Sequence, residues 1–282
     1  MKHFGFFPAS RFGQPKSRNT KAFAVAIVLA LTVCGSTTFS TLHAQSAGIY
    51  PLRVSSNGRY LVGQNDVPFL IVGDSPQGLI SDLSTTEAET YFADRASYGF
   101  NAVQIHLFGG ATFGGRSDYS TYDGITPFTT AGDISTPNER YFARVDAMLT
   151  LAAQHGIVVF LTAAETIDSL GLFRFNGVAR SRAFGQYLGN RYKTFDNIVW
   201  DYGNDFQTWR TASDNAVILA VANGIKDTDA RHLHTVWLDY FVSASRDSPD
   251  WNALVDLDFA YTYYATYAKV LDEYEQIGRA HV

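Results

Sequence analysis

Residues 197–205, Asn-Ile-Val-Trp-Asp-Tyr-Gly-Asn-Asp, place a carboxylate directly after an apolar run. The run ends in Gly203, Asn204 and Asp205, and Trp200 is one of several aromatic residues around it. This pattern is typical of a buried parallel strand whose carboxyl end opens on the mouth of an α/β barrel. A carboxylate beside an amide and aromatic rings suits proton transfer to a sugar oxygen. The alternative is a strand followed by a turn, in which Asp205 caps the next element.

Asp205 is the leading candidate for a general acid/base. The pKa of an ordinary aspartic acid is about 3.9, which is too low for a proton donor at neutral pH. Burial or a second carboxylate nearby must therefore raise the pKa of a residue in this role. Asn204 is placed to hydrogen-bond a sugar hydroxyl beside the scissile bond. Glu165, expected at the end of the third strand, is the nearest second acid along the chain. It is a partner carboxylate, a substrate ligand or a residue of the barrel rim, and we favour the last two.

Three further polar residues lie on the first two expected strands or directly after them, and all three are candidate substrate contacts. Asp74 ends the first strand within Gly-Asp-Ser-Pro-Gln-Gly, where a cap or turn role competes with contact to a ligand hydroxyl. Gln104 and His106 alternate on the second strand, so one face of that strand turns both inward. A histidine at such a position is either a core residue or part of the site.

The later strands end in residues that suit sugar stacking. Together, they predict a platform on which a sugar ring stacks, formed by three aromatic residues and one carboxylate: Trp237, Tyr263, Tyr264 and Asp239. His232 and His234 form an H-x-H pair that could bind a metal, but it begins its strand, away from the catalytic face. We therefore predict a structural role for the pair, no metal site and no cofactor. The sequence contains no phosphate-binding glycine loop, G-x-S-x-G or H-E-x-x-H motif.

Strands and helices alternate along the chain in a way that positions these residues. An Asn-Gly turn at residues 57–58 predicts an N-terminal β-hairpin. About six β/α units follow, with expected strands at residues 68–73, 101–108, 157–161, 197–203, 234–238 and 257–264. Helices are expected at residues 84–98, 136–154, 176–191, 213–225 and 266–276, and a glycine-rich insertion at residues 109–133 follows the second strand. The pattern predicts an α/β fold, a (β/α)₈ TIM barrel that is incomplete.

The first 44 residues read as a secretory signal peptide. A basic leader without acidic residues precedes an apolar run over residues 22–33, and Leu-His-Ala at residues 42–44 fits a cleavage site. The apolar run is shorter than the ~20 residues that span a bilayer. We therefore expect export, to the periplasm or the medium, with no membrane attachment after cleavage.

Cleavage at this site changes the charge and thiol content of the chain. The segment holds five of the 22 basic residues, none of the 27 acidic ones and the only cysteine, Cys34, so the formal net charge moves from −5 to −10. An acidic protein is a poor partner for nucleic acid. The mature chain has no thiol for a disulfide or for catalysis. Neither charge nor composition predicts an oligomeric state.

The C-terminal end departs from the pattern. Six β/α units do not close an eight-stranded barrel, and residues 277–282, Ile-Gly-Arg-Ala-His-Val, resemble an in-frame translation of a common sequencing adapter. We therefore predict three segments: a signal peptide at residues 1–44, a partial catalytic domain at residues 45–276 and an adapter-derived tail. An open barrel exposes unpaired strand edges, so a fragment of this kind is expected to fold poorly.

Several blocks together resemble the apiosidase-like glycoside hydrolases, which are secreted bacterial barrels acting on side chains of plant cell-wall polysaccharides. The similarity covers residues 49–276, and these blocks carry it: Pro-Leu-Arg-Val at 51–54, Phe-Leu-Ile-Val-Gly-Asp-Ser at 69–75, Gly-Phe-Asn-Ala-Val at 99–103, Gly-Asn-Arg-Tyr at 189–192, Asn-Ile-Val-Trp at 197–200 and Gly-Asn-Asp at 203–205. The resemblance implies a layout with the acid/base, here Asp205, ending strand four. It implies a glutamate nucleophile ending strand seven, which has no counterpart in this chain.

The sequence thus leads to one main hypothesis and two alternatives. The main one is a fragment of an exported, retaining glycoside hydrolase that acts on pectic side chains and is inactive without its nucleophile strand. A carbohydrate-binding pseudoenzyme would use the same aromatic rim without chemistry. A metal-dependent hydrolase built on His232 and His234 is the third possibility. The sugar and the linkage are not specified by the sequence.

Overall fold

The computed structural model describes residues 48–241, 243–277 and 280–281. The predicted signal peptide at residues 1–44 lies outside the described residues. Within the described ranges, no helix is both long enough and apolar enough to cross a bilayer.

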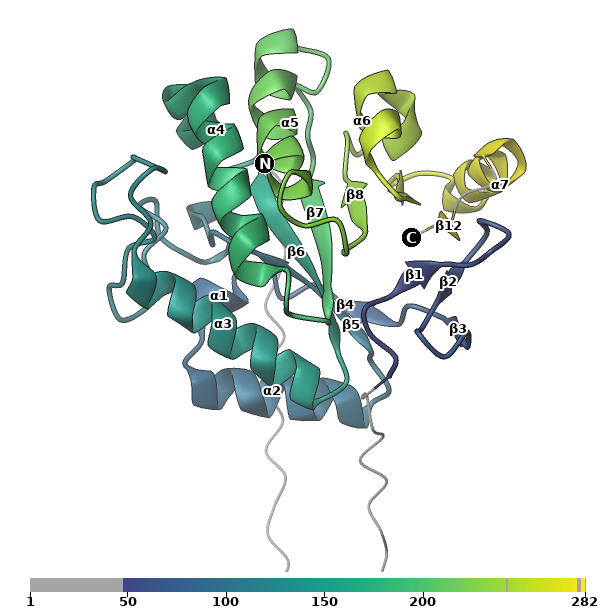
Figure 1. Cartoon of the computed structure of the whole chain (residues 1–282), viewed down its shortest axis with the longest axis horizontal. Helices are drawn as coiled ribbons and strands as arrows, with labels where there is room; N and C mark the ends of the chain where they lie inside the picture. The colour runs from purple at the N-terminus through teal and green to yellow at the C-terminus, as the bar shows by residue number, and fades with distance from the viewer. Residues whose placement is uncertain (1–47, 242, 278–279, 282) are drawn as a thin grey trace, which may run out of the picture. The chain divides into compact units, whose positions relative to one another are not determined.

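A five-stranded parallel sheet forms the centre of the fold (Figure 1). Its strands lie side by side in chain order: β4 (Gly73–Asp74), β5 (Ala102–His106), β6 (Val158–Glu165), β7 (Ile198–Gly203) and β8 (His234–Val236). The strand order never reverses, unlike that of a doubly wound sheet. The arrangement therefore confirms an α/β fold with a parallel sheet and suits a segment of a barrel wall.

Seven helices accompany the strands within the described residues. They are α1 (Leu79–Asp82), α2 (Thr85–Ser97), α3 (Glu139–Gln154), α4 (Leu170–Tyr192), α5 (Ala212–Lys226), α6 (Pro249–Leu254) and α7 (Thr266–Ile277). The α2 helix begins at the expected capping box, in which Ser84 accepts from the Glu87 amide and the Glu87 carboxylate binds the Ser84 amide. A short 3₁₀ helix, η1 (Ala111–Phe113), lies in the glycine-rich insertion after β5.

Two helix starts differ from the sequence-based expectation. Helix α3 begins at Glu139, not Thr136, because the side chain of Asn138 caps it by accepting from the amide of Arg140. Helix α4 begins six residues before residue 176 and bends at Gly177, whose φ of 72° is left-handed. Glycine at this position permits the bend that joins the two helical parts.

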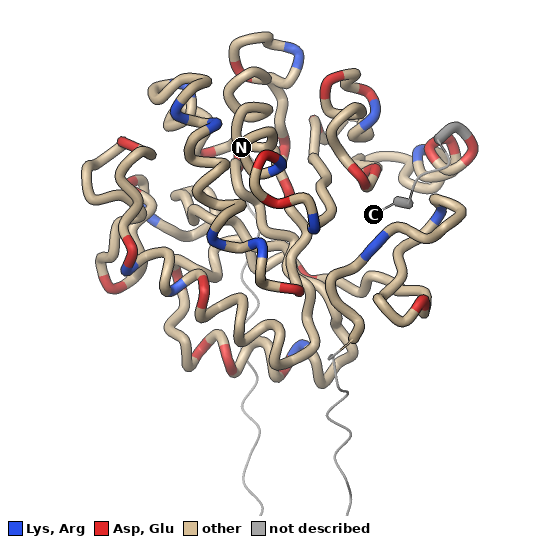
Figure 2. The backbone as a smooth tube through the Cα atoms, viewed as in Figure 1, with Lys and Arg blue, Asp and Glu red and all other residues tan. Residues whose placement is uncertain are grey.

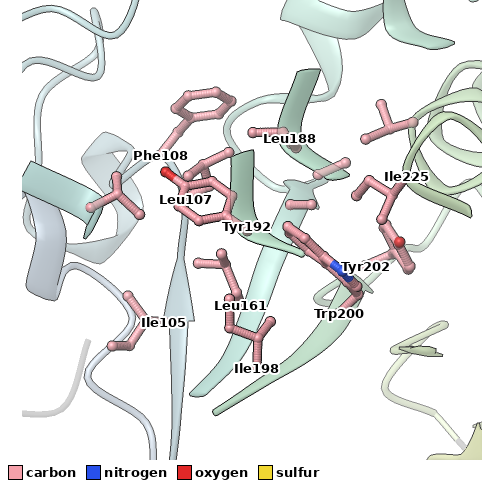
Figure 3. Close-up of a cluster of buried hydrophobic side chains, with 14 of the residues drawn as sticks. Ile105, Leu107, Phe108, Leu161, Leu188, Tyr192, Ile198, Trp200, Tyr202 and Ile225 are labelled. Atoms are coloured by element: carbon pink, nitrogen blue, oxygen red, sulfur yellow. The ribbon is translucent and has the colours of Figure 1, made fainter. Parts of the chain in front are cut away.

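The main core lies between the sheet and the helices. Figure 3 shows Leu161 and Trp200 from neighbouring strands packed beside Leu188, Tyr192 and Ile225, which come from the helices. Residues on both faces of β6 and β7 are buried, as expected for strands of a parallel α/β sheet. The polar residues on these strands therefore lie in an otherwise apolar environment.

The N-terminal hairpin packs on the other face of the sheet. The expected antiparallel strands β1 (Arg53–Val54) and β2 (Leu61–Val62) form around the Asn-Gly turn, and β3 (Pro68–Phe69) pairs with β2. Their side chains join a second apolar cluster that includes Leu52, Leu61, Val158 and Val199. Val158 begins β6, so the hairpin covers the amino ends of the strands and leaves the carboxyl ends open.

The expected sixth strand, residues 257–264, is not a single strand of the sheet. It divides into β10 (Leu257–Asp258), which pairs with β12 (Ala280–His281), and β11 (Ala260–Tyr261), which pairs antiparallel with β9 (Ser243–Ala244). The chain turns between them because Phe259 exchanges hydrogen bonds with Ser245, through its carbonyl at 3.2 Å and its amide at 3.0 Å. The Ser245 hydroxyl also donates to the carbonyl of Val236 at 2.7 Å, so this side chain bridges β8 and Phe259.

Close glycine contacts hold α4 against α5. A Cβ atom on Gly185 would lie 2.1 Å from the carbonyl oxygen of Val221, and one on Gly224 would lie 2.1 Å from that of Arg182. Both clashes involve helix backbone, which cannot move without separating the two helices. These glycines set the spacing of the helices that cover β6 and β7.

We expect Gly185→Ala to lower the free energy of unfolding by about 1–3 kcal/mol through this overpacking. Gly171→Ala on the same helix is the matched control, because a Cβ there meets nothing within 4 Å. Urea denaturation of both variants checks the difference. Equal stability of the two variants would show that the helix spacing does not depend on Gly185.

Candidate active site

The end of β7 carries a strained turn that positions Asn204 and Asp205. Gly203, Asn204 and Asp205 have φ values of 91°, 66° and 53°, all left-handed. Non-glycine residues adopt this conformation at an energetic cost and are enriched at functional sites. A Cβ on Gly203 would lie 2.1 Å from the carbonyl oxygen of Trp237, so only glycine fits against β8 here.

Asp205 is half-buried and held by a tyrosine. The Tyr261 hydroxyl donates to Oδ1 of Asp205 and lies 2.9 Å from the Tyr263 hydroxyl. Among the described residues, Oδ2 of Asp205 has no hydrogen-bond partner, so this oxygen is left without a competing protein donor. Burial and the neighbouring carboxylate raise the pKa of Tyr261, which keeps its proton on the hydroxyl. Sequence reasoning missed Tyr261, although it alternates with the expected Tyr263.

Asn204 is buried beside Asp205. Its Oδ1 accepts from Nε2 of Gln77 at 3.4 Å, and its carbonyl oxygen accepts from the Thr166 hydroxyl at 3.2 Å. Gln77 follows β4 and Asn204 follows β7. The contact between their side-chain amides therefore joins the segments after these two strands. Gln77 was not among the residues singled out from the sequence.

A buried polar network lies below this turn. Gln104 points inward, as expected, and its Nε2 donates to Oδ2 of Asp201 at 3.0 Å, while the Thr162 hydroxyl donates to the same oxygen at 2.7 Å. Ser75 donates to Oε1 of Gln104 at 2.8 Å. Asp201 is fully buried, and burial raises its pKa to about 7 against the lowering effect of its hydrogen bonds. In the sequence, the one feature that marked Asp201 was its charge within an otherwise apolar strand.

His106 also points into this interior and is fully buried. Burial lowers its pKa to about 3, so the ring is neutral at physiological pH. Neither ring nitrogen has a hydrogen-bond partner among the described residues. The ring packs edge-on against Phe113 of η1, with centroids 4.5 Å apart. His106 is therefore a buried polar group directly beneath the glycine-rich insertion.

Glu165 ends β6 but its carboxylate turns toward the following loop. It accepts from the amides of Ile167, Asp168 and Ser169, which lead into α4, the last two at 3.0 and 3.1 Å. Burial raises its pKa to about 7, although these amides act in the opposite direction. These contacts hold the start of α4, and the predicted contact of Glu165 with substrate stays a prediction.

Asp74 and Asp239 likewise accept hydrogen bonds from other protein groups. Asp74 accepts from the Tyr91 hydroxyl of α2 at 2.9 Å and from the Ser75 amide at 2.8 Å. Asp239 accepts from Nε1 of Trp209 at 2.9 Å and lies 3.0 Å from the Arg210 guanidinium. Asp74 thus joins the end of β4 to α2, and Asp239 joins the segment after β8 to the loop that carries Asp205. Their predicted contact with substrate stays a prediction.

An aromatic wall stands next to Asp205. The Trp237 ring packs against Phe259 and Tyr261 with centroids 4.3 and 5.1 Å apart. Trp237 and Phe259 line a cavity of about 390 Å³ together with Gln104 and Ser75. Of the expected platform, Tyr263 and Tyr264 are 68% and 63% exposed, and Tyr263 joins the wall through Tyr261.

The His232-x-His234 pair is engaged in two separate interactions. Nδ1 of His232 lies 2.7 Å from Oδ2 of Asp229, and Nδ1 of His234 lies 2.8 Å from the Tyr202 hydroxyl. Within the described ranges, no group of three or more His, Cys, Asp or Glu residues is arranged to hold a metal ion. The observed contacts accord with a structural role at the amino end of β8.

We expect the stability of the protein to fall as pH rises from about 4 to 7. Asp201 and Glu165 have folded-state pKa values raised to about 7, so the folded state holds more protons than the unfolded chain in this window. For Asp201 the loss is on the order of a few kcal/mol. Asp201→Asn should reduce this slope, whereas Asp196→Asn on the surface should leave it unchanged. Urea denaturation between pH 4 and 8 tests this, and an unaltered slope in Asp201→Asn contradicts it.

Comparison with solved structures supports a glycoside hydrolase fold. A glycoside hydrolase family 5 protein from Bacteroides vulgatus is 25% identical, with a TM-score of 0.64 over 74% of this chain and 44% of that one. Another glycoside hydrolase structure is 24% identical, with a TM-score of 0.62 over 74% and 45%. A family 5 mannosidase from Rhizomucor miehei, 14% identical, has a TM-score of 0.55 over 77% and 61%. The chain thus spans less than half the length of the first two structures.

Comparison with curated proteins finds no match. A family model for the apiosidase-like catalytic domain matches residues 55–281, which is most of the chain and includes every strand of the parallel sheet. The carboxylate on a strained turn at the carboxyl end of β7 accords with this match. The chain therefore belongs to the apiosidase-like family of glycoside hydrolases.

Proposed function

We propose that this chain carries the acid/base half of an exported, retaining glycoside hydrolase that removes side-chain sugars from plant cell-wall polysaccharide. The observation that carries the proposal is Asp205, which lies on a left-handed turn with one carboxylate oxygen bound by Tyr261 and the other free. The turn opens beside the aromatic wall formed by Trp237 and Phe259. Rings of this kind bind the apolar face of a sugar while the carboxyl group reaches the glycosidic oxygen.

The proposed reaction assigns a distinct task to each residue of the turn. Protonated Asp205 donates its proton through Oδ2 to the oxygen of the leaving group, and then removes a proton from the attacking water. Tyr261 fixes the orientation of the carboxyl group through Oδ1. The side chain of Asn204 is held by Gln77 and presents its amide N–H groups to a sugar hydroxyl.

A retaining mechanism also needs a nucleophilic carboxylate about 5–5.5 Å from Asp205. Glu165, Asp74 and Asp239 end or follow strands of the sheet, but each already accepts hydrogen bonds from protein groups. The donors are loop amides for Glu165, the Tyr91 hydroxyl for Asp74 and the Trp209 indole for Asp239. We therefore infer that the nucleophile belongs to a part of the enzyme outside these 282 residues, and that the chain alone does not hydrolyse glycosides. The greater length of the similar structures supports this inference.

A carbohydrate-binding protein without activity is the second candidate function. It is favoured by one observation, namely that no second free carboxylate lies beside Asp205 among the described residues. The uninterrupted gene distinguishes the two functions: a glutamate at the end of the seventh barrel strand supports the enzyme. Hydrolysis of pectic oligosaccharides by the full-length protein then identifies the sugar.

In the full-length enzyme, we expect Asp205→Asn to lower kcat about 10²–10⁴-fold, because the leaving group loses its proton donor. The loss should be smaller for an aryl glycoside whose leaving group needs no proton. Asp196→Asn, an exposed carboxylate before β7, is the matched control and should retain full activity. Undiminished hydrolysis by Asp205→Asn would refute the assignment.

We expect Tyr261→Phe to lower kcat/KM about tenfold or more, because a hydrogen bond to a charged group is lost. The change should affect kcat more than KM, since Tyr261 orients the acid rather than the sugar. Tyr263→Phe is the matched control, because its hydroxyl contacts Tyr261 and not Asp205. Steady-state kinetics of both variants make the comparison, and equal effects would argue against a specific role for Tyr261.

A further inference from the structure

A second cavity of about 460 Å³ opens between α1 and η1, on the side of the fold that carries Asp205. Its volume is within the range of small-molecule sites. The polar residues that line it are Ser75, Gln77, Asp82 and Thr112, and Phe113 adds an aromatic ring. No lysine, arginine or histidine is among the lining residues.

Close backbone packing builds this cavity. A Cβ on Gly78 would lie 2.7 Å from the carbonyl oxygen of Phe113, and one on Gly109 would lie 1.9 Å from the Ser81 hydroxyl. The Thr112 hydroxyl and amide both bind the Asp168 carboxylate, at 2.8 and 2.9 Å, which ties η1 to the loop after β6. The walls are thus held by contacts that do not depend on a ligand.

Asp82 gives the cavity an uncompensated negative charge. The Ser81 hydroxyl donates to Oδ1 of Asp82 at 3.0 Å, and no ion pair to Asp82 occurs in the part of the chain that the structure describes. The nearby Arg144 binds the carbonyl of Leu83 but directs its guanidinium to both oxygens of Asp123, at 2.8 and 2.6 Å. Its charge is therefore already neutralised by another carboxylate.

The cavity is connected to the catalytic turn. Nε2 of Gln77, whose residue lines the cavity, lies 3.4 Å from Oδ1 of Asn204 and 3.4 Å from Oε1 of Gln104. Ser75 lines both this cavity and the one in front of Trp237. Beneath Phe113, the buried His106 ring has no hydrogen-bond partner among the described residues. A ligand in the cavity would therefore adjoin Gln77, which contacts Asn204, the residue before Asp205.

We propose that this cavity binds an uncharged sugar residue of the polysaccharide, next to the residue at the scissile linkage, and that Asp82 excludes a uronate there. The proposal rests on the proposed function, which supplies the saccharide. A carboxylate accepts strong hydrogen bonds from sugar hydroxyls. A second carboxylate placed beside Asp82 in this open cavity is repelled, and such repulsion provides specificity. Phe113 offers its ring to the apolar face of the sugar.

Binding of two probes to the 282-residue chain tests the proposal by isothermal titration calorimetry. The neutral probe is arabinotriose and the acidic probe is trigalacturonate, both at 20 mM and 500 mM salt. We expect arabinotriose to bind at least tenfold more tightly at low salt. The preference should shrink at high salt, because screening weakens the repulsion. The salt comparison needs no variant and so does not depend on how a substitution affects folding.

Asp82→Asn should weaken arabinotriose binding several-fold and strengthen trigalacturonate binding, so that the preference narrows. Asp196→Asn changes the net charge equally at the opposite end of the strands and should leave both affinities unchanged. Tighter binding of trigalacturonate, absence of arabinotriose binding, or the same shift in both variants would overturn the proposal. None of these results bears on the role of Asp205, which is tested separately by hydrolysis in the full-length enzyme.

Discussion

The position of the candidate acid depends on how the end of β7 fits between its neighbours. The carbonyl of Gly203 accepts from the Thr166 amide of the β6 side at 2.8 Å, and the Phe206 amide donates to Leu238 of the β8 side at 2.9 Å. The left-handed turn between these bonds leaves no room for a Cβ at Gly203. Backbone contacts on both sides therefore overdetermine the turn, which is the condition under which strained residues persist in a fold.

The interior below the turn is polar where most of the sheet is apolar. Asp201 accepts from Gln104, Thr162 and the Tyr202 amide, so its buried oxygens are satisfied by donors from three adjacent strands. Burial without such donors would cost several kcal/mol. The same donors fix the amide of Gln104, which in turn accepts from Ser75. A network of this kind links the position of β4 to that of β7.

Much of the order of strands and helices was predictable from the sequence, because residue patterns within each element determine where it begins and ends. The alternation of apolar strands and capped helices predicted the parallel sheet, and Gly203-Asn204-Asp205 marked where its fourth strand ends. The directions of Glu165, Asp74 and Asp239 were not predictable, because each depends on a partner from a loop or a distant segment. Tyr261 and Gln77 were missed for the same reason: they reach Asp205 and Asn204 from positions 56 and 127 residues away. The division of the sixth strand was likewise not predictable, because Phe259 bonds to Ser245, which lies outside that strand.

The surface next to β4 bears on where the proposed nucleophile would lie. The cavity in front of Trp237 is lined on one side by Trp237 and Phe259 and on the other by Ile71 and Gly73, so it extends from the end of β8 across to β4. Leu70 and Val72, which precede β4, are 79% and 42% exposed. Further strands laid against β4 would cover these side chains and bring their carboxyl ends to the same mouth, facing the aromatic wall. A carboxylate at such a strand end would approach a sugar from the side opposite Asp205, as double displacement requires.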